Sequence, residues 1–207
     1  LNDLIQKLEF DTIYHEHLSY FSLLPIINWV NQFGLEVFDI KKQSVHGGTI
    51  RVFITKKGNI LQKNSVQEFL DEEYQYGLDK ILTYEKFAQN IIDLKLDLVK
   101  YITKIKKEKK SLIGYGASAK GNVLLNYCNI DHTILDFIID TTPLKQGKFT
   151  PGTHIPILSP NEIENKGDGD VVLLLAWNYE SAILEKEKLF RSKGGKFLIP
   201  IPKPRIL

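Results

Sequence analysis

A short polar run near the start of the chain holds side chains that can move protons. Tyr14, His15, Glu16 and His17 follow one another within the stretch FDTIYHEHLSYFS. A histidine titrates near neutral pH and can act as a general base, and a nearby carboxylate holds its tautomer and stabilises its cation. A tyrosine hydroxyl can donate a hydrogen bond to a developing enolate oxygen. The run therefore indicates an acid/base site, and polar residues scattered on a loop are the competing interpretation.

The same run is a poor set of metal ligands. His15 and His17 are two residues apart, no third ligand follows at a recognisable spacing, and the His-Glu-x-x-His pattern does not occur. We therefore expect no metal. The single cysteine, Cys128, excludes an internal disulfide and fits a reducing, cytoplasmic location.

A glycine-rich loop in the second half of the chain is the other candidate site. The run GYGASAKGN places Gly114 and Gly116 directly after an apolar stretch, with Lys120 at the start of a predicted helix. Glycines allow the backbone to approach a phosphate, and a helix N-terminus offers free N–H groups and partial positive charge. Lys120 would add a cation, and Asp140 ends the next predicted strand, where a ribose-binding acid would lie.

The spacing of this loop leaves its role open. It reads G-x-G-x-x-x-x-G and differs from the dinucleotide pattern G-x-G-x-x-G. Binding of a nucleotide or phosphate, a purely structural strand-to-helix turn, and an NAD redox site are the three interpretations. If the loop binds a substrate, Asn122 on the same predicted helix joins Gly114, Gly116, Lys120 and Asp140 as a candidate contact.

Strands and helices alternate around this loop. The apolar runs SLIGYGA, TILDFIID, DVVLLLAW and KFLIPIP are typical of strands, and a shorter strand is predicted near 155–158. Helices are predicted over 118–127 and 179–192, and a further helix is expected after Ser159. A βαβ succession of this kind predicts an α/β fold, a Rossmann-like doubly wound parallel sheet.

The first half of the chain has a different texture. A helix is predicted from Pro25 to Gly34, followed by strands over 35–40 and 49–55 that form a hairpin. Ser65 and Glu68 match a capping box at the start of another helix. Apolar residues then recur at helical spacing from Thr83 onward, which predicts a connecting helix of about 25 residues, or roughly 37 Å.

Composition limits the partners that we expect. The formal net charge is +2, and acidic and basic residues are interspersed, so the basic stripe of a nucleic-acid binder is missing. The basic run from Lys104 to Lys110 is interpreted as a solvated helix end whose lysines complement the helix dipole. The apolar runs are too short to span a membrane. We expect no nucleic-acid or membrane partner, and the sequence does not indicate an oligomeric state.

Four blocks together carry a family resemblance. FDTIYHEHLSYFSL, HGGTIRVF, GYGASAKGNVLLNY and DTTPLKQGKFTPGTHIPI occur in this order over about residues 10 to 157. They resemble the S-adenosylmethionine-dependent C-methyltransferases that act on nucleotide-linked keto-deoxysugars.

The resemblance implies roles for individual residues. It implies that Tyr14, Glu16 and His17 are acid/base residues that remove a proton next to the ketone of the sugar and give an enolate. His17 is the expected base, Glu16 orients it, and Tyr14 assists proton transfer or binds the enolate. His46 and Arg51 on the hairpin are expected to contact the sugar nucleotide, with loop packing and a surface charge as the alternative.

The resemblance also implies a domain organisation. Family members have an N-terminal zinc module, a central methyltransferase domain and a C-terminal Rossmann-like domain. The cysteine-rich segment and the S-adenosylmethionine loop are not found here, the sequence contains no methionine, and it starts at Leu1. We therefore expect a C-terminal portion with a methyltransferase tail at 1–60, a helical connector at 61–110 and a Rossmann-like domain at 111–207. The alternative is a non-catalytic module that binds a nucleotide or nucleotide sugar.

Overall fold

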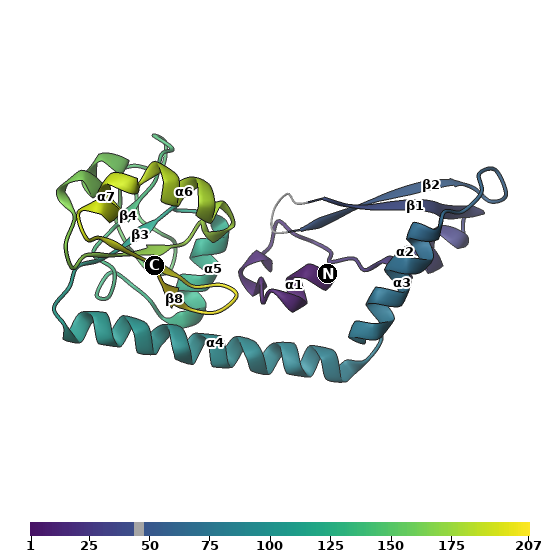
Figure 1. Cartoon of the computed structure of the whole chain (residues 1–207), viewed down its shortest axis with the longest axis horizontal. Coiled ribbons are helices and arrows are strands. Elements are labelled where there is room, and N and C mark those ends of the chain that lie inside the picture. The colour runs from purple at the N-terminus through teal and green to yellow at the C-terminus, as the bar shows by residue number, and fades with distance from the viewer. Residues whose placement is uncertain (44–47) are drawn as a thin grey trace. The chain divides into compact units, whose positions relative to one another are not determined.

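The computed structural model describes residues 1–43 and 48–207 of the chain, whose elements are labelled in Figure 1. His46 lies outside the described residues. The chain divides into two compact units. Unit 1 contains Leu1–Phe10 and His17–Asn90, and unit 2 contains Asp11–Glu16 and Ile91–Leu207.

A two-stranded antiparallel hairpin forms the sheet of unit 1. Strands β1 (Leu35–Gln43) and β2 (Thr49–Lys56) pair with Ile40 opposite Val52. The register shifts between Val37 and Asp39, which marks a β-bulge. Because the bulge adds one residue, Val37 and Ile40 are both buried although they are three positions apart. The predicted hairpin is confirmed.

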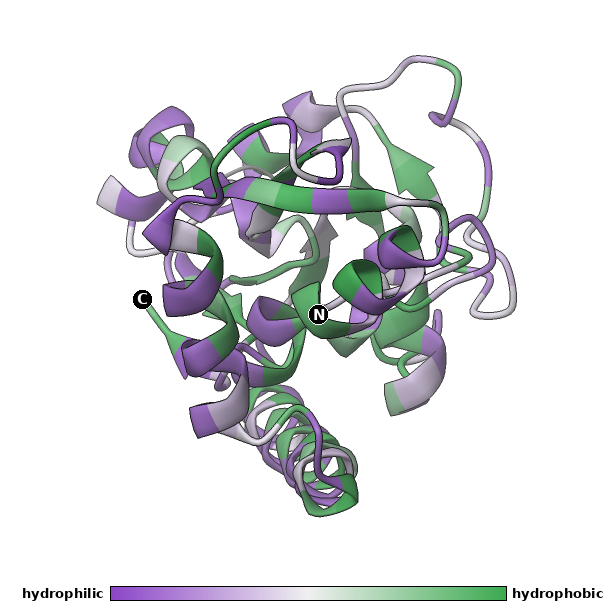
Figure 2. Cartoon of the chain, turned by 90° about the vertical axis from the view of Figure 1, so that its right-hand side faces the viewer, coloured by the Kyte–Doolittle hydropathy of each residue, from purple (hydrophilic) through white to green (hydrophobic). Residues whose placement is uncertain are grey.

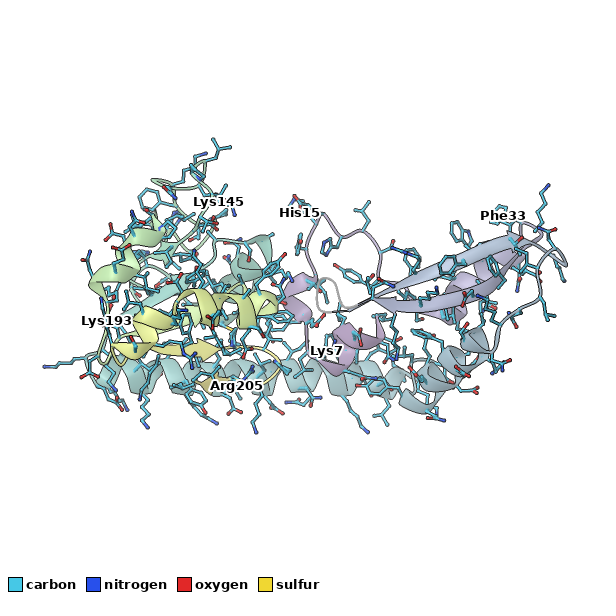
Figure 3. All side chains as sticks on the ribbon, turned by 45° about the horizontal axis from the view of Figure 1, so that its top comes forward. Lys7, His15, Phe33, Lys145, Lys193 and Arg205 are labelled. Atoms are coloured by element: carbon cyan, nitrogen blue, oxygen red, sulfur yellow. The ribbon has the colours of Figure 1, made fainter. Side chains whose placement is uncertain are left out.

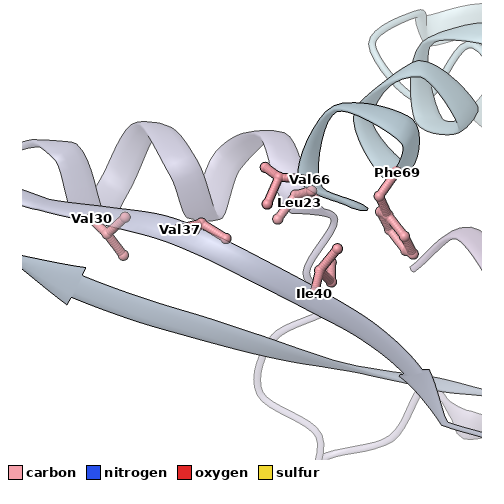
Figure 4. Close-up of a cluster of buried hydrophobic side chains, with 6 residues drawn as sticks. All are labelled: Leu23, Val30, Val37, Ile40, Val66 and Phe69. Atoms are coloured by element: carbon pink, nitrogen blue, oxygen red, sulfur yellow. The ribbon is translucent and has the colours of Figure 1, made fainter. Parts of the chain in front are cut away.

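Two helices cover the hairpin of unit 1. Helix α2 (Leu23–Asn31) and helix α3 (Asn64–Tyr76) both pack against β1. Their shared core consists of Leu23, Val30, Val37, Ile40, Val66 and Phe69 (Figure 4). The short helix α1 (Asn2–Gln6) contributes to a second apolar cluster with Leu78.

The predicted capping box at Ser65 and Glu68 is wrong. Helix α3 begins at Asn64, its N-cap is Lys63, and no side chain caps it. Ser65 therefore lies inside the first turn, and its hydroxyl donates a 2.8 Å hydrogen bond to Asp39 Oδ1 on β1. Lys63 Nζ binds the other oxygen of Asp39 at 2.6 Å. These contacts tie the helix to the strand instead of closing its end.

A buried glutamate from α3 caps helix α2. Glu73 is only 4% exposed, and its Oε1 accepts a 2.7 Å hydrogen bond from the N–H of Leu23. Its Oε2 accepts from the N–H of Leu24 at 3.3 Å. A carboxylate at a helix N-terminus satisfies free N–H groups and interacts favourably with the helix dipole.

The predicted long helix is confirmed as α4 (Ile81–Lys107), which has 27 residues. Figure 2 looks almost along this helix and shows both hydrophobic and hydrophilic residues around it. Its buried residues are Ile91, Leu94, Leu98, Ile102 and Ile105. Ile92 and Val99 were predicted on the same apolar face but are exposed. Each directly follows a buried residue, so its side chain points about 100° away around the helix. The boundary between the units falls within α4, after Asn90.

Unit 2 is built on a six-stranded sheet in the order β5-β4-β3-β6-β7-β8. The first five strands in sequence are parallel, and β8 pairs antiparallel with β7 at the edge. The strands are β3 (Leu112–Tyr115), β4 (Ile138–Ile139), β5 (Ile157–Leu158), β6 (Val171–Leu174), β7 (Lys196–Ile199) and β8 (Arg205–Ile206). The chain runs outward from β3 to β5 and returns to β6, so the α/β prediction with a doubly wound parallel sheet is confirmed.

Short helices connect these strands. Helix α5 (Ala119–Cys128) follows β3, and 3-10 turns η3 (Pro160–Asn165) and η4 (Trp177–Tyr179) follow β5 and β6. The helix predicted over 179–192 is two helices, α6 (Glu180–Lys186) and α7 (Lys188–Ser192). Between them the buried Glu187 accepts a 2.7 Å hydrogen bond from the hydroxyl of Tyr115. None of the helices in the described part of the chain has the length and apolar character of a membrane-spanning segment.

Replacing Glu73 by alanine tests the remote cap of α2. The change leaves two N–H groups without their acceptor, so the free energy of unfolding should fall by about 1–3 kcal/mol. Urea unfolding measures the loss, and amide hydrogen exchange should locate it in α2. Glu72→Ala is the matched control, because Glu72 is the exposed neighbour and its ion pair with Lys42 contributes at most about 1 kcal/mol. Equal losses in the two variants would contradict the capping role.

Candidate active site

The predicted acid/base residues lie on an irregular loop between η1 (Phe10–Thr12) and α2. Tyr14 is half-buried, whereas His15, Glu16 and His17 are exposed. The side chain of His15 is labelled in Figure 3. The rings of Tyr14 and His15 meet edge to face with their centres 6.4 Å apart. Tyr14 and Glu16 belong to unit 2, and His17 is the first residue of the loop that belongs to unit 1.

A buried aspartate holds the start of this loop in unit 2. Asp11 has no exposed surface, and its Oδ2 accepts a 2.7 Å hydrogen bond from the indole N–H of Trp177. The two residues are 166 positions apart in the chain. Exposure rises from 0% at Asp11 to 46% at Ile13, so the chain leaves the core within two residues.

Lys120 completes this group, which we call the Asp11 cluster: Asp11, Lys120 and Trp177. Lys120 Nζ lies 4.9 Å from the centre of the Trp177 ring, a cation–π contact. Within the described residues, neither Lys120 Nζ nor Asp11 Oδ1 makes a hydrogen bond, although both atoms are buried. The cluster therefore holds two opposite charges away from water.

Burial changes the acidity of Asp11. It raises the pKa of the carboxyl from 3.8 to about 6, because the charged form loses its hydration. The hydrogen bond from Trp177 and the charge of Lys120 act in the opposite direction and limit this rise. Asp11 thus carries a proton at mildly acidic pH and a charge at neutral pH.

The Asp11 cluster lies at the carboxyl ends of two neighbouring strands. Lys120 is in the first turn of α5, after β3, and Trp177 begins η4, after β6. Strands β3 and β6 are parallel neighbours, and the direction of winding reverses between them. Ligands of open α/β sheets bind at this switch point. In this chain, the hydrogen bond between Asp11 and Trp177 lies at the switch point.

Gly114 in β3, Gly116 after the strand and Gly121 in α5 lie close to neighbouring side chains. A Cβ added to Gly114 would lie 2.7 Å from Ile138 Cγ1, and one on Gly116 would lie 2.8 Å from Ala176 Cβ. A Cβ on Gly121 would lie 2.8 Å from Leu175 Cβ. Gly116 also has a φ of +91°, which favours glycine. Close packing therefore accounts for these three glycines, and a phosphate-binding role for the loop stays a prediction.

Asp140 is bound to the same loop. Its Oδ2 accepts a 2.7 Å hydrogen bond from the N–H of Ala117 and a 3.2 Å bond from Lys145 Nζ, and its Oδ1 accepts from the N–H of Thr142. Burial pushes the pKa of Asp140 upward, but the bonds from Thr142 and Lys145 outweigh it and hold the pKa below its usual value. The carboxylate that was predicted to bind a ribose is thus hydrogen-bonded to the backbone of the glycine loop.

The remaining candidate contacts are Asn122, which follows Lys120 by two residues on α5, and the predicted hairpin residues Arg51 and His46. Asn122 is half-buried on α5, and its Oδ1 makes no hydrogen bond within the described residues. Arg51 is exposed on β2 in unit 1 and lies opposite Lys41 in the hairpin. His46 falls outside the described residues.

Two members of the Asp11 cluster were missed by sequence reasoning. Asp11 precedes the polar run by three residues, and Trp177 directly follows the apolar stretch DVVLLLA. A large side chain with a polar N–H at the end of a buried strand was the available signal, because buried indole N–H groups usually find a partner.

Comparison with known proteins assigns the chain to a family. The sequence model of a family described as C-methyltransferase C-terminal domain matches residues 44–202. The chain is also 39% identical over 208 aligned residues to the C-methyltransferase NovU of Streptomyces niveus. The chain belongs to the C-methyltransferase family. The family resemblance found in the sequence is confirmed.

The extent of the two similarities matters for the site. The alignment with NovU covers 100% of this chain but 49% of NovU, so the chain spans about half the length of this relative. The C-methyltransferase domain match starts at residue 44, after the loop with Tyr14 and His17, whereas the NovU alignment includes that loop. Both include the glycine loop and Trp177.

The fluorescence of Trp177 should report the ionisation of Asp11. The chain has two tryptophans, and Trp29→Phe leaves Trp177 as the reporter. We expect its emission to change with a midpoint near pH 6, because the charge on its hydrogen-bond acceptor appears there. Asp11→Asn in the same background should abolish the transition. A transition that persists in Asp11→Asn would assign it to another group.

Asp11 should also change the stability of the fold with pH. The folded chain keeps a proton on Asp11 that the unfolded chain releases near pH 3.8, so this contribution to the free energy of unfolding falls as pH rises from about 4 to 6. The full change is up to roughly 3 kcal/mol. Urea unfolding of the wild type and of Asp11→Asn at several pH values measures this contribution. The other carboxyl groups contribute equally to both proteins, so they cancel in the difference. Parallel stability curves for the two proteins would refute it.

Proposed function

We propose that this chain is the C-terminal portion of an S-adenosylmethionine-dependent C-methyltransferase that acts on a nucleotide-linked keto-deoxysugar through an enolate. The observation that carries the proposal is the 39% identity to a C-methyltransferase along the whole chain, which includes the Tyr14–His17 loop. The acidic and basic side chains of this loop are exposed, as residues that meet a substrate must be.

The residues of this chain act on the proton in the proposed reaction. His17 accepts the proton from the carbon next to the ketone, and the electron pair of the broken C–H bond moves onto the ketone oxygen. Tyr14 donates a hydrogen bond to that oxygen, and Glu16 orients and stabilises the imidazolium. A general base of this kind lowers the barrier by about 3–5 kcal/mol.

The glycine loop of unit 2 is not proposed as the site of S-adenosylmethionine. A Cβ added at Gly114, Gly116 or Gly121 would clash with a neighbouring side chain, and Asp140 accepts a hydrogen bond from the N–H of Ala117 in this loop. When bound, S-adenosylmethionine supplies an electrophilic methyl group, and we assign its site to a part of the protein outside this chain. In this proposal residues 1–60 are the tail of the methyltransferase domain, 61–110 connect, and 111–207 form the second domain.

The substitution His17→Asn in the full-length protein tests the assignment of the base. Asparagine keeps hydrogen-bonding capacity but cannot take a proton near neutral pH. We expect kcat to fall by about 10²–10⁴-fold, with little change in affinity for the sugar nucleotide. Exchange of the α-proton with deuterated solvent, followed by NMR, should slow by a similar factor.

Two further variants make this test specific. His15→Asn is the matched control, because His15 is an exposed histidine two residues away on the same loop and should leave kcat unchanged. Tyr14→Phe should slow both reactions less than His17→Asn does, since the tyrosine only assists. Normal α-proton exchange in His17→Asn would place the base elsewhere.

A protein made of these 207 residues alone is expected to lack methyltransferase activity. Its residues provide the proton-transfer groups but not the proposed site for the methyl donor. The assay compares methyl transfer from labelled S-adenosylmethionine by this protein and by the full-length protein. Transfer by the shorter protein would overturn the domain assignment. Binding of nucleotide sugars without methyl transfer in the full-length protein would favour the non-catalytic module.

A further inference from the structure

We propose that Asp11, Trp177 and Lys120 are positioning residues that hold the catalytic loop segment with Tyr14 and Glu16 on unit 2. The inference rests on the proposed function for the roles of Tyr14 and Glu16. It assigns Lys120 to the support of the loop, whereas the sequence suggested a phosphate contact, and it adds two residues that no motif identified.

A buried hydrogen bond holds the start of this segment. Asp11 and Trp177 are joined at 2.7 Å, and Asp11 is fully buried. Tyr14 follows Asp11 by three residues, so its Cα lies within about 11 Å of a fixed point. All residues of the segment Asp11–Glu16 belong to unit 2, as do Lys120 and Trp177. The contact therefore places Tyr14 and Glu16 within that one unit.

Lys120 adds a positive charge beside this hydrogen bond. Its ammonium group is buried against the Trp177 ring at 4.9 Å, and its charge acts on Asp11. Opposite charges attract strongly where water is excluded. The glycines beside it are packed against side chains. Lys120 therefore stabilises the charged form of Asp11, which accepts the hydrogen bond from the indole N–H of Trp177.

An anchor at the root of the loop matters for catalysis. The loop beyond Ile13 is irregular, and the side chains of His15 and Glu16 are exposed. Catalytic groups displaced by about 1 Å can lose 100-fold in rate. A buried, charge-assisted hydrogen bond at the root of the loop limits such displacement without touching the substrate.

The test uses three variants of the full-length protein. Trp177→Phe removes the N–H donor but keeps an aromatic ring, Asp11→Asn removes the charge but keeps an acceptor, and Lys120→Met removes the ammonium. Lys95→Met is the matched control, because Lys95 Nζ also lies 4.9 Å over an aromatic ring, that of Tyr127, elsewhere in unit 2. Methyl transfer and α-proton exchange are measured with a nucleoside diphosphate-linked keto-deoxysugar that the wild type turns over.

We expect Trp177→Phe to lower kcat and the rate of α-proton exchange by about 10- to 100-fold, with KM within about threefold of the wild type. Asp11→Asn and Lys120→Met should do the same to a smaller extent, and Lys95→Met should match the wild type. The double variant Asp11→Asn/Trp177→Phe should be no slower than Trp177→Phe, because the two residues share one contact.

A second readout needs no substrate. Amide hydrogen exchange should become faster in the peptide that spans residues 12–17 in Trp177→Phe, while strands β3 and β6 stay protected. Unchanged kcat in both Trp177→Phe and Asp11→Asn would overturn the inference, as would an equal loss in Lys95→Met. If Trp177→Phe does not fold, kcat and amide exchange of Asp11→Asn test the inference instead. A wild type that methylates nothing would defeat the proposed function, whereas unchanged amide exchange at 12–17 would defeat the anchor by itself.

Discussion

A hydrogen bond buried in unit 2 joins the indole N–H of Trp177 to the carboxylate of Asp11, and the placement of the Tyr14–Glu16 segment in that unit depends on it. This segment lies outside the helices and strands and follows the 3-10 turn η1. Breaking the bond would leave a buried carboxylate without its donor, a state that costs far more than an exposed hydrogen bond. The contact is therefore a constraint on the fold as well as a candidate element of catalysis.

The groups of the Rossmann-like sheet that could meet a phosphate or a ribose already make contacts within unit 2. Asp140 binds the glycine loop and Lys145, and Lys120 lies over Trp177. Polar groups bound in this way would have to give up those contacts to hold a ligand.

Much of the architecture could be predicted from the sequence because it depends on local pattern. Apolar runs predicted the hairpin, the parallel strands and the long helix. The break at Glu187, whose side chain accepts a hydrogen bond from Tyr115, 72 residues earlier, escaped prediction. Ser65 was misassigned because its partner Asp39 lies on another element. The candidate site divides in the same way: the polar run is visible in the sequence, but Asp11 and Trp177 are 166 residues apart.

The carboxyl end of strand β3 shows how contacts between residues far apart in the sequence act together. Tyr115, the last residue of the strand, donates a hydrogen bond to the buried Glu187. Burial of the tyrosine and this hydrogen bond both raise the pKa of its hydroxyl. The next residue, Gly116, packs against Ala176, immediately before Trp177. The strand end, the glycine turn and the tryptophan that binds Asp11 thus form one continuous chain of contacts. A side chain added at Gly116 would push on Ala176 and so on the neighbour that holds Asp11, although it lies far in sequence from the loop whose placement it would disturb.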